Sequence, residues 1–336
     1  MNRQLSYAKA ILEATDQALS LSPDVVVLGQ LVDTKSGIFG TTTGLADKHG
    51  AGRVRDFPVS ENLMTATAMG AALTGLRPVI AHQRLDFMLY SLDAIANWLA
   101  LWHFKSNGKS AMPVTIRTIV GKGWGQGPQH SKSLHAWFAH LPGLRVAMPA
   151  TAYDAKGLLL ESIFSESPAI FVEGRGLYSM TDDVPEEPYR VRFGQAVVRR
   201  PGTDVTVVAL GTMVPVALRA AAILEKDGVQ VEVVDPRTVT PLDRKSICDS
   251  AFKTRRLVVA DPGWGSFGAA AEIIATVAEN LGDRLKAKPI RVTLPDSHTQ
   301  MSLALEPEYY PDDSDVVAAI RRSLRQLEPS TSNGLH

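Results

Sequence analysis

The sequence predicts an α/β fold made of two doubly wound modules. Short apolar runs rich in β-branched residues recur along the chain, and segments with helical spacing separate them. The same alternation starts again after an interruption near residue 185. Buried runs separated by helices are typical of parallel strands joined by crossover helices on both faces of a sheet. A length of 336 residues suits two domains of roughly 150 residues each.

The first module is expected over residues 1–185. Its predicted strands are the apolar runs at 25–28, 78–81, 114–120, 145–148 and 169–173. Its predicted helices show apolar residues at helical spacing, and they cover 7–20, 61–74, 92–103 and 151–165. The segment 182–189 is rich in proline and acidic residues, which is typical of a linker.

The second module is expected over residues 186–328. Its predicted strands lie at 205–210, 231–235, 257–260 and 290–293. Its predicted helices lie at 214–226, 243–251 and 269–281. The last residues, 329–336, are rich in Ser, Asn and Gly, so we expect a flexible tail there.

Composition narrows the classes of function. Lys plus Arg and Asp plus Glu both number 35, so no net charge attracts nucleic acid or an anionic membrane. Cys248 is the single cysteine, which excludes an intrachain disulfide and a multi-cysteine metal cluster. The N-terminal stretch lacks the apolar core of a signal peptide, and no apolar run approaches the length of a membrane span. These features predict a soluble cytoplasmic protein with neither nucleic acid nor membrane as a partner.

Common nucleotide and metal fingerprints are absent from the sequence. No GxGxxG follows a strand, and neither a P-loop nor an HExxH helix occurs. The glycine-rich stretch 121–127 follows a predicted strand but does not open a helix at the spacing of a phosphate cradle. It is more typical of an active-site loop whose backbone turns sharply and approaches a ligand closely.

Candidate functional side chains follow successive predicted strands. Glu61 lies in the first turn of a helix, Phe87 and Asp93 follow the next strand, and His130 follows the third. The carboxyl ends of parallel strands converge on one crevice, where these groups would suit proton transfer on a bound ring. Each has a structural alternative: Glu61 and Asp93 can complement a helix dipole, Phe87 can be a core residue, and His130 can lie on a surface loop.

Several segments in chain order carry a family resemblance. They are FPVSENLMTATAMGAALTGL at 57–76, QHSKSLHAWFAHLPG at 129–143, AKGLLL at 155–160, DPRTVTP at 235–241, GWGSFGAAAEI at 263–273 and EPEYYPD at 306–312. Together the segments resemble the beta subunit of thiamine-diphosphate-dependent 2-oxo acid dehydrogenases of the pyruvate and branched-chain type, in the transketolase-like superfamily. The resemblance covers about residues 3–325. It implies a thiamine-diphosphate pyrimidine-binding domain followed by a transketolase C-terminal-like domain.

The resemblance also implies how the cofactor is shared. In this family thiamine diphosphate lies between two chains, and an alpha subunit with a GDG…N motif holds Mg²⁺ and the diphosphate. This sequence contains no GDG, so we expect no metal on this chain and an α2β2 heterotetramer with β–β contact. Glu61 matches the glutamate that hydrogen-bonds the pyrimidine ring nitrogen. A carboxyl that donates this bond is protonated, which burial in an apolar cleft favours.

Further site residues are implied position by position. His130 matches the histidine that faces the reactive carbon and assists acyl transfer to a lipoyl arm, so a lipoylated acyltransferase is a further expected partner. Phe87 matches the aromatic residue that packs on the pyrimidine, and Val59 would lend packing or a backbone group. Gln83 and Tyr90 lie in the same cofactor-binding stretch.

Departures from the family pattern concern the substrate. Asp93 matches a carboxylate of the polar channel between paired sites, but Gln30 replaces a glutamate usual in that channel. Arg84 can recognise a carboxylate or phosphate at two points; the alternative is a structural pair with Asp86 or Asp93.

Other departures point the same way. Lys132, with Lys122 and His135, makes the loop around His130 basic, and residues 299–301 replace an aromatic and proline-rich stretch. Together these departures predict a more polar substrate than pyruvate.

The resemblance implies a potassium ion as well, held by backbone carbonyls at positions that correspond to Val114, Ser162, Ile163, Ser165 and Ser167. Two other functions stay open at this point. One is a split transketolase-like or acyloin-forming transferase that acts on a polar or phosphorylated acceptor. The other is a non-catalytic, beta-like assembly subunit.

Overall fold

The computed structural model describes residues 2–121 and 125–326. The chain forms two compact units. Unit 1 comprises Met1–Gly194, Arg237–Pro241 and Thr299–Leu303, and unit 2 comprises Gln195–Pro236, Leu242–His298 and Ala304–His336. Two short segments from the second half of the sequence therefore belong to the first unit. The tail predicted at 329–336 lies outside the described residues.

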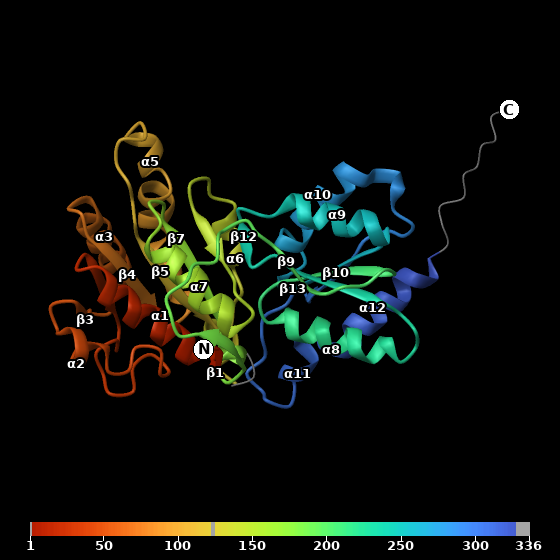
Figure 1. The fold of residues 1–336 in the computed structure, drawn as a ribbon, viewed down its shortest axis with the longest axis horizontal. Coiled ribbons are helices and arrows are strands. Elements are labelled where there is room, and N and C mark those ends of the chain that lie inside the picture. Colours follow the sequence, from red (N-terminus) through yellow and green to blue (C-terminus); the bar gives the residue numbers. More distant parts are fainter. Residues whose placement is uncertain (1, 122–124, 327–336) are drawn as a thin grey trace. The chain divides into compact units, whose positions relative to one another are not determined.

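Unit 1 is built on a seven-stranded sheet with the order β12-β6-β7-β5-β4-β2-β3 (Figure 1). Its strands are β2 (Val25–Gly29), β3 (Val54–Asp56), β4 (Arg77–His82), β5 (Thr115–Val120), β6 (Arg145–Ala147), β7 (Ala169–Gly174) and β12 (Thr238–Thr240). Six strands run parallel, and β12 pairs antiparallel with β6 at the edge. All six residues of β7 are buried, which explains why such strands are mostly apolar in sequence.

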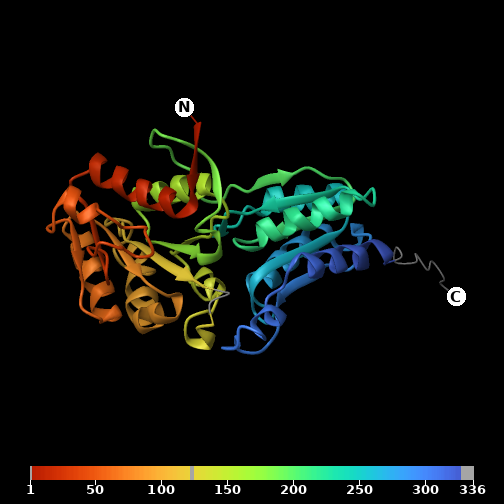
Figure 2. The ribbon, with the colours of Figure 1, turned by 90° about the horizontal axis from the view of Figure 1, so that it is seen from below.

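Helices cover both faces of this sheet. They are α1 (Tyr7–Leu21), α2 (Leu45–His49), α3 (Glu61–Leu73), α4 (Leu85–Met88), α5 (Trp102–Lys105), α6 (His135–Ala139) and α7 (Ala152–Ile163). α1 and α7 share one apolar cluster with strand residues such as Val27 and Val79, whereas α3 packs on β4 from the other face (Figure 2). Ser6 and Thr151 cap α1 and α7 with their hydroxyls. The predicted crossover helices on both faces are confirmed.

The helix predicted over 92–103 was wrong as a single element. The chain forms a 3₁₀ turn η1 (Leu89–Ser91), a π-helical segment η2 (Ala94–Leu99) and then α5. Gly143 packs against this break so closely that a Cβ there would lie 2.1 Å from the carbonyl oxygen of Ala100. Tertiary packing of this kind has no trace in local helical spacing.

The sequence analysis predicted a linker over residues 182–189. The structure instead places residues 182–185 in a strand. β8 (Thr181–Pro185) pairs antiparallel with β1 (Asn2–Ser6), with Asn2 opposite Pro185 and Ser6 opposite Thr181. Acidic and proline residues hide this strand because they are uncommon in sheets. The ribbon fastens the start of the chain to the end of the main segment of unit 1.

Unit 2 holds a five-stranded sheet with the order β14-β13-β10-β11-β9. The strands are β9 (Val197–Arg200), β10 (Val205–Ala209), β11 (Val231–Asp235), β13 (Leu257–Trp264) and β14 (Ile290–Leu294), of which β9 alone runs antiparallel. The helices are α8 (Met213–Glu225), α9 (Arg244–Thr254), α10 (Ala269–Leu281), α11 (Glu306–Tyr309) and α12 (Asp313–Arg325). α8 packs with α12, and α9 packs with α10. The α/β prediction is confirmed for both units.

The strand β9 and the helices α11 and α12 of unit 2 were missed by the sequence analysis. β9 is a polar edge strand, and α12 is an amphipathic helix that begins with a capping box at Asp312 and Asp315. Within the described residues, none of the helices combines the length and the apolar character that a membrane crossing requires.

Candidate active site

The predicted site residues gather at one edge of the sheet in unit 1. Glu61 begins α3, which follows β3; Phe87 lies in α4, which follows β4; and His130 follows β5. These strands run parallel, so their carboxyl ends face the same edge. The topology thus explains why residues from distant parts of unit 1 share one site.

Glu61 is bound by Gln30, which is in turn bound by Gln83. Gln30 Nε2 donates to Glu61 Oε1 at 3.3 Å, and Gln83 Nε2 donates to the Gln30 carbonyl oxygen at 3.4 Å. The Glu61 side chain is partly exposed in the single chain. Thr65, one turn further along α3, donates to Ser91 Oγ at 3.0 Å and so fixes α3 against the segment that follows α4. The carboxyl group therefore has a defined position with a neutral amide as its neighbour.

Phe87 and His130 are in direct contact. Their ring centroids lie 5.3 Å apart and their planes are nearly perpendicular, at 85°. Edge-to-face contacts of this kind are favourable for aromatic rings. His130 Nδ1 and Ser131 Oγ are buried and have no hydrogen-bond partner among the described residues. Most buried polar atoms in folded proteins are hydrogen-bonded, so these two atoms stand out at this edge of the sheet.

Lys132 makes an ion pair across the site. Its Nζ lies 3.0 Å from Asp86 Oδ1, and the Asp86 side chain is only 5% exposed. The pair fastens the loop that carries His130 to the helix α4 that carries Phe87. Sequence analysis predicted Lys132 as a basic residue of the site but did not predict Asp86 as its partner.

The glycine-rich loop comes close to another part of the chain. Gly127 has a φ of +65°, and a Cβ there would lie 2.4 Å from Met301 Cγ. Gly125 also has a positive φ and lies against Leu303 and Met301. The predicted sharp turns are present, and they accommodate the segment Thr299–Leu303. Lys122, predicted as a basic residue of this loop, lies outside the described residues.

Three predicted residues lie on the surface instead of in this cluster. Val59 is 81% exposed and Tyr90 is 72% exposed. Asp93 is exposed and accepts a hydrogen bond from Asn97 Nδ2 at 2.7 Å, one helical turn further on. Roles for these residues in cofactor binding or in a channel therefore depend on a second chain at this face.

Arg84 is buried beside the loop. It donates from Nη1 to the Gln83 carbonyl oxygen at 2.6 Å and from Nη2 to Gln126 Oε1 at 3.1 Å. Asp86 is bound to Lys132, and Asp93 to Asn97.

Residues that the sequence analysis missed also lie at this edge. Phe39 lies within cation–π distance of both Arg84 and Arg175. His82 ends β4, is 3% exposed, and its ring nitrogens have no hydrogen-bond partner among the described residues. Burial lowers the pKa of His82 to about 3, so the ring is neutral near pH 7. His82 is the last residue of β4, and Arg175 directly follows β7. Their position at the ends of apolar runs in the sequence is the feature from which both could have been predicted.

A buried ion pair supports the sheet below the site. Arg117 in β5 binds Glu173 in β7 at 2.7 Å, and Tyr178 donates to the same carboxylate at 2.5 Å. Burial alone lowers the pKa of Arg117, but the Glu173 charge and hydrogen bonds outweigh it and raise the pKa. Thr41 accepts a further bond from Arg117 at 2.8 Å, which anchors the loop that carries Phe39.

The carbonyl groups expected to bind potassium have a cationic neighbour. Arg77 Nη1 donates to the Ser165 carbonyl at 3.1 Å and to the Ile163 carbonyl at 3.4 Å. The Val114 carbonyl accepts from Ala169 N at 3.0 Å. A guanidinium group therefore already binds two of the five expected carbonyls.

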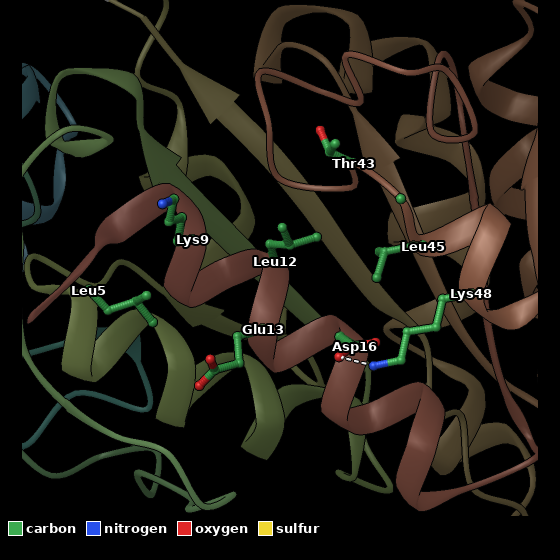
Figure 3. Close-up of a pocket in the computed structure, with 9 residues that line it drawn as sticks. Leu5, Lys9, Leu12, Glu13, Asp16, Thr43, Leu45 and Lys48 are labelled. Atoms are coloured by element: carbon green, nitrogen blue, oxygen red, sulfur yellow. Dashed lines mark hydrogen bonds and ion pairs between the residues drawn. The ribbon is translucent and has the colours of Figure 1, made fainter. Parts of the chain in front are cut away.

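One cavity in unit 1 is separate from this site. It has a volume of about 350 Å³ and lies between α1 and the start of α2 (Figure 3). Its carboxylates are paired: Asp16 with Lys48 at 2.6 Å, and Glu13 with Lys156 at 2.6 Å. None of the site residues lines this cavity.

The two α/β units and the strand-end site define a two-domain protein of the transketolase type. Residues 3–181 match the family model "Transketolase, pyrimidine binding domain", and residues 194–316 match "Transketolase, C-terminal domain". With the relatives described next, these matches show that the chain belongs to the beta-subunit family of thiamine-diphosphate-dependent 2-oxo acid dehydrogenases. The resemblance found in the sequence is confirmed.

Relatives span the whole chain. It is 39% identical to the acetoin:2,6-dichlorophenolindophenol oxidoreductase subunit beta of Cupriavidus necator, over 97% of this chain and 99% of the relative. It is 37% identical to the pyruvate dehydrogenase E1 component subunit beta of Bacillus subtilis, over 96% and 99%. A solved structure described as "Split gene transketolase, inactive beta4 tetramer" has a TM-score of 0.79 and 24% identity, with 96% and 99% coverage. At that identity the likeness shows the fold.

Proposed function

We propose that this chain forms the aminopyrimidine half of a thiamine-diphosphate site and is active with an alpha subunit. The observation that carries the proposal is the grouping of Glu61, Phe87 and His130 at one sheet edge. In the proposed assembly, an α2β2 heterotetramer with β–β contact, the alpha subunit supplies the GDG…N motif for Mg²⁺ and the diphosphate. The described residues contain no group of three or more His, Cys, Asp or Glu that could hold a metal.

The residues fit a flat, nitrogen-containing ring. Phe87 offers an aromatic ring, Glu61 a carboxyl group, and His130 a buried Nδ1 that has no partner among the described residues. Val59 and Tyr90, both largely exposed, would contribute at the rim when a second chain covers them. Thiamine diphosphate supplies the electron sink that decarboxylation of a 2-oxo acid requires.

The chain's own residues manage protons in this proposal. Glu61 Oε1 accepts from Gln30, and Oε2 is the carboxyl oxygen that would face a ring nitrogen of the cofactor. Phe87 fixes the plane of His130, whose imidazole ring nitrogens face the reacting group in this proposal. The Lys132–Asp86 pair keeps the loop of His130 in place.

Partners and compartment follow from the same family. We propose a cytoplasmic enzyme whose acyl product passes to a lipoylated acyltransferase. Exposed apolar residues of α3 and of the segment 94–105 suit contact with further subunits, and they are Leu63, Leu73, Trp98, Leu101 and Phe104. Because Arg77 binds the carbonyls of Ile163 and Ser165, we propose that its guanidinium takes the place of potassium there.

Replacement of Glu61 by Gln tests this function. In the complex with a coexpressed alpha subunit, E61Q should lower 2-oxo-acid-dependent reduction of 2,6-dichlorophenolindophenol by about 10²- to 10⁴-fold, because the amide cannot supply the proton. Thermal unfolding should stay unchanged, since Glu61 is partly exposed. The matched control is E279Q in α10, an exposed glutamate of unit 2, which should keep full turnover. Unchanged turnover in E61Q would favour the non-catalytic assembly subunit.

A further inference from the structure

Two arginines and a phenylalanine form a cluster beside the proposed catalytic groups. We call Arg84, Arg175 and Phe39 the double-arginine cluster. The guanidinium carbons of Arg84 and Arg175 lie 5.0 Å and 4.9 Å from the centroid of the same Phe39 ring. Arg84 follows β4, Arg175 follows β7, and Phe39 lies in the segment after β2. All three therefore stand at the sheet edge that carries Glu61 and His130.

Hydrogen bonds join this cluster to the proposed catalytic residues. Arg84 donates to the carbonyl oxygen of Gln83, whose side chain reaches Gln30 and through it Glu61. Arg84 also donates to Gln126, four residues before His130 in the same loop. These two acceptors fix the plane of the Arg84 guanidinium at the edge of the sheet.

Arg84, Arg175 and Lys132 place three cationic side chains at this edge. Arg175 lies 4.7 Å from the centroid of the Tyr178 ring as well. Of the nearby carboxylates, Glu173 binds Arg117 and Asp86 binds Lys132. The pKa of Arg84 is lowered, mainly by burial and also by the positive charge of Arg175. Tyr178 and Asp86 act in the opposite direction, but their effect is smaller. The two guanidinium groups beside the Phe39 ring repel each other, and a bound anion that contacts both of them reduces this repulsion.

The cluster is open to solvent on one side. Arg84 is 5% exposed, but Arg175 is partly exposed, Gln126 is exposed, and Phe39 is 39% exposed. Phe39 has a φ of +48°, and it lies between Gly37 and Gly40, both with positive φ. Phe39 therefore lies in a tight turn flanked by glycines, and its ring contacts both arginines while part of it stays exposed.

We propose that the double-arginine cluster binds an oxyanion, a carboxylate or a phosphate, carried by the substrate or by the acceptor of this enzyme. This inference rests on the proposed function and names the chemical class of its substrate. A guanidinium group binds either oxyanion at two points. The reacting carbon of the substrate would then lie toward Glu61 and His130, with its anionic end at Arg84.

A binding experiment tests the cluster without turnover. The probes are inorganic phosphate and succinate, added at constant ionic strength to the complex with its alpha subunit, saturated with thiamine diphosphate and Mg²⁺. At least one probe should raise the melting temperature relative to chloride by about 2 °C or more. R84Q and R175Q should abolish the shift, whereas R322Q, an exposed arginine of α12 in unit 2, should keep it.

The E61Q complex separates this inference from the proposed function. It should lack turnover and still show the full shift, because binding of the anion does not need the Glu61 carboxyl. A shift with phosphate alone would indicate a phosphorylated substrate, and a shift with succinate alone would indicate a second carboxylate. No shift with either probe, or an equal shift in R84Q, would overturn the inference.

Substrate pairs supply a second readout. We expect R84Q to lower the ratio of kcat/KM for 2-oxoglutarate over 2-oxobutanoate, or for glyceraldehyde 3-phosphate over glyceraldehyde as acceptor, by about 10- to 100-fold. R84K keeps the charge and loses the planar fork, so its ratio should lie between those of R84Q and the unchanged chain. Equal ratios in all three proteins would contradict the assignment.

Discussion

One buried imidazole makes the stability of this protein depend on pH. His82 ends β4, is 3% exposed, and has a pKa lowered by burial to about 3. In the unfolded chain a histidine takes up a proton below about pH 6.5. Between these two values the unfolded state binds a proton that the native state does not bind. The free energy of unfolding therefore falls as the pH is lowered from 6.5 toward 3.

Replacement of His82 by Leu should remove this dependence. Each pH unit in that window costs up to about 1.4 kcal/mol, or about 2 kcal/mol between pH 6.5 and pH 5. We expect urea unfolding at pH 7 and pH 5 to show a smaller difference in H82L than in the unchanged chain, by about that amount. The exposed His140 gives the control H140Q, which should keep the full difference. An equal difference in H82L would contradict a neutral native His82.

Single residues were predictable where they follow a strand directly. Phe87 and His130 come after the apolar runs at 78–81 and 114–120, and parallel topology converts that position into proximity. Glu61 was predicted from its place in the first turn of a helix, since β3 before it is not an apolar run. The sequence carries no comparable signal for the pairing of Asp86 with Lys132 or of Phe39 with two arginines. Such contacts depend on loop paths, which side-chain periodicity does not encode.

At the scale of elements, an ion pair joins the loop of His130 to α4. K132M should leave the nearly buried Asp86 carboxylate without its cation and destabilise the protein by about 1–3 kcal/mol. D86N alone should cost less, and the double variant should recover part of the loss of K132M. Urea unfolding of the four proteins measures this coupling.

The same variants test positioning of the histidine. K132M should also lower kcat and alter its dependence on pH, because the loop that orients His130 is released. K245M is the matched control, since the Lys245–Asp249 pair lies one turn apart on the exposed face of α9 and should add little stability. Additive effects of D86N and K132M would contradict the coupling.

Most elements were predictable, and the exceptions have a physical reason. Buried parallel strands such as β7 and β10 consist mostly of apolar residues, which mark them clearly. Polar edge elements such as β8 and β9 lack that mark. The segment 92–103 has helical spacing, but close packing of Gly143 at Ala100 accompanies its division into a π-helical and an α-helical part.

For the whole molecule, exposed apolar side chains predict association. Phe104 is 86% exposed at the end of α5, and Trp98 and Leu101 nearby are 42% and 40% exposed. Large apolar patches on a protein surface are typical of protein–protein contacts. We expect F104S to weaken assembly, seen as a lower molar mass in light scattering after size exclusion at micromolar concentration. F252S, which removes an exposed ring from α9 of unit 2, should leave the mass unchanged.

The division of the molecule into two α/β units was predictable from the sequence, but the exact composition of each unit was not. Two rounds of strand and helix alternation are present in the sequence and in the two units. The return of Arg237–Pro241 and Thr299–Leu303 to unit 1 was not predicted, because short segments without their own core carry no compositional signal.

The ribbon of β1 and β8 has a practical consequence for anyone who handles this polypeptide. Asn2 stands opposite Pro185, so an affinity tag joined directly to the first residues would emerge beside the end of β8. A flexible spacer of several glycines and serines would let the tag point away and keep every rung of the ladder intact. Deletion of the first six amino acids, by contrast, would strip β8 of its only neighbour within the described part of the polypeptide.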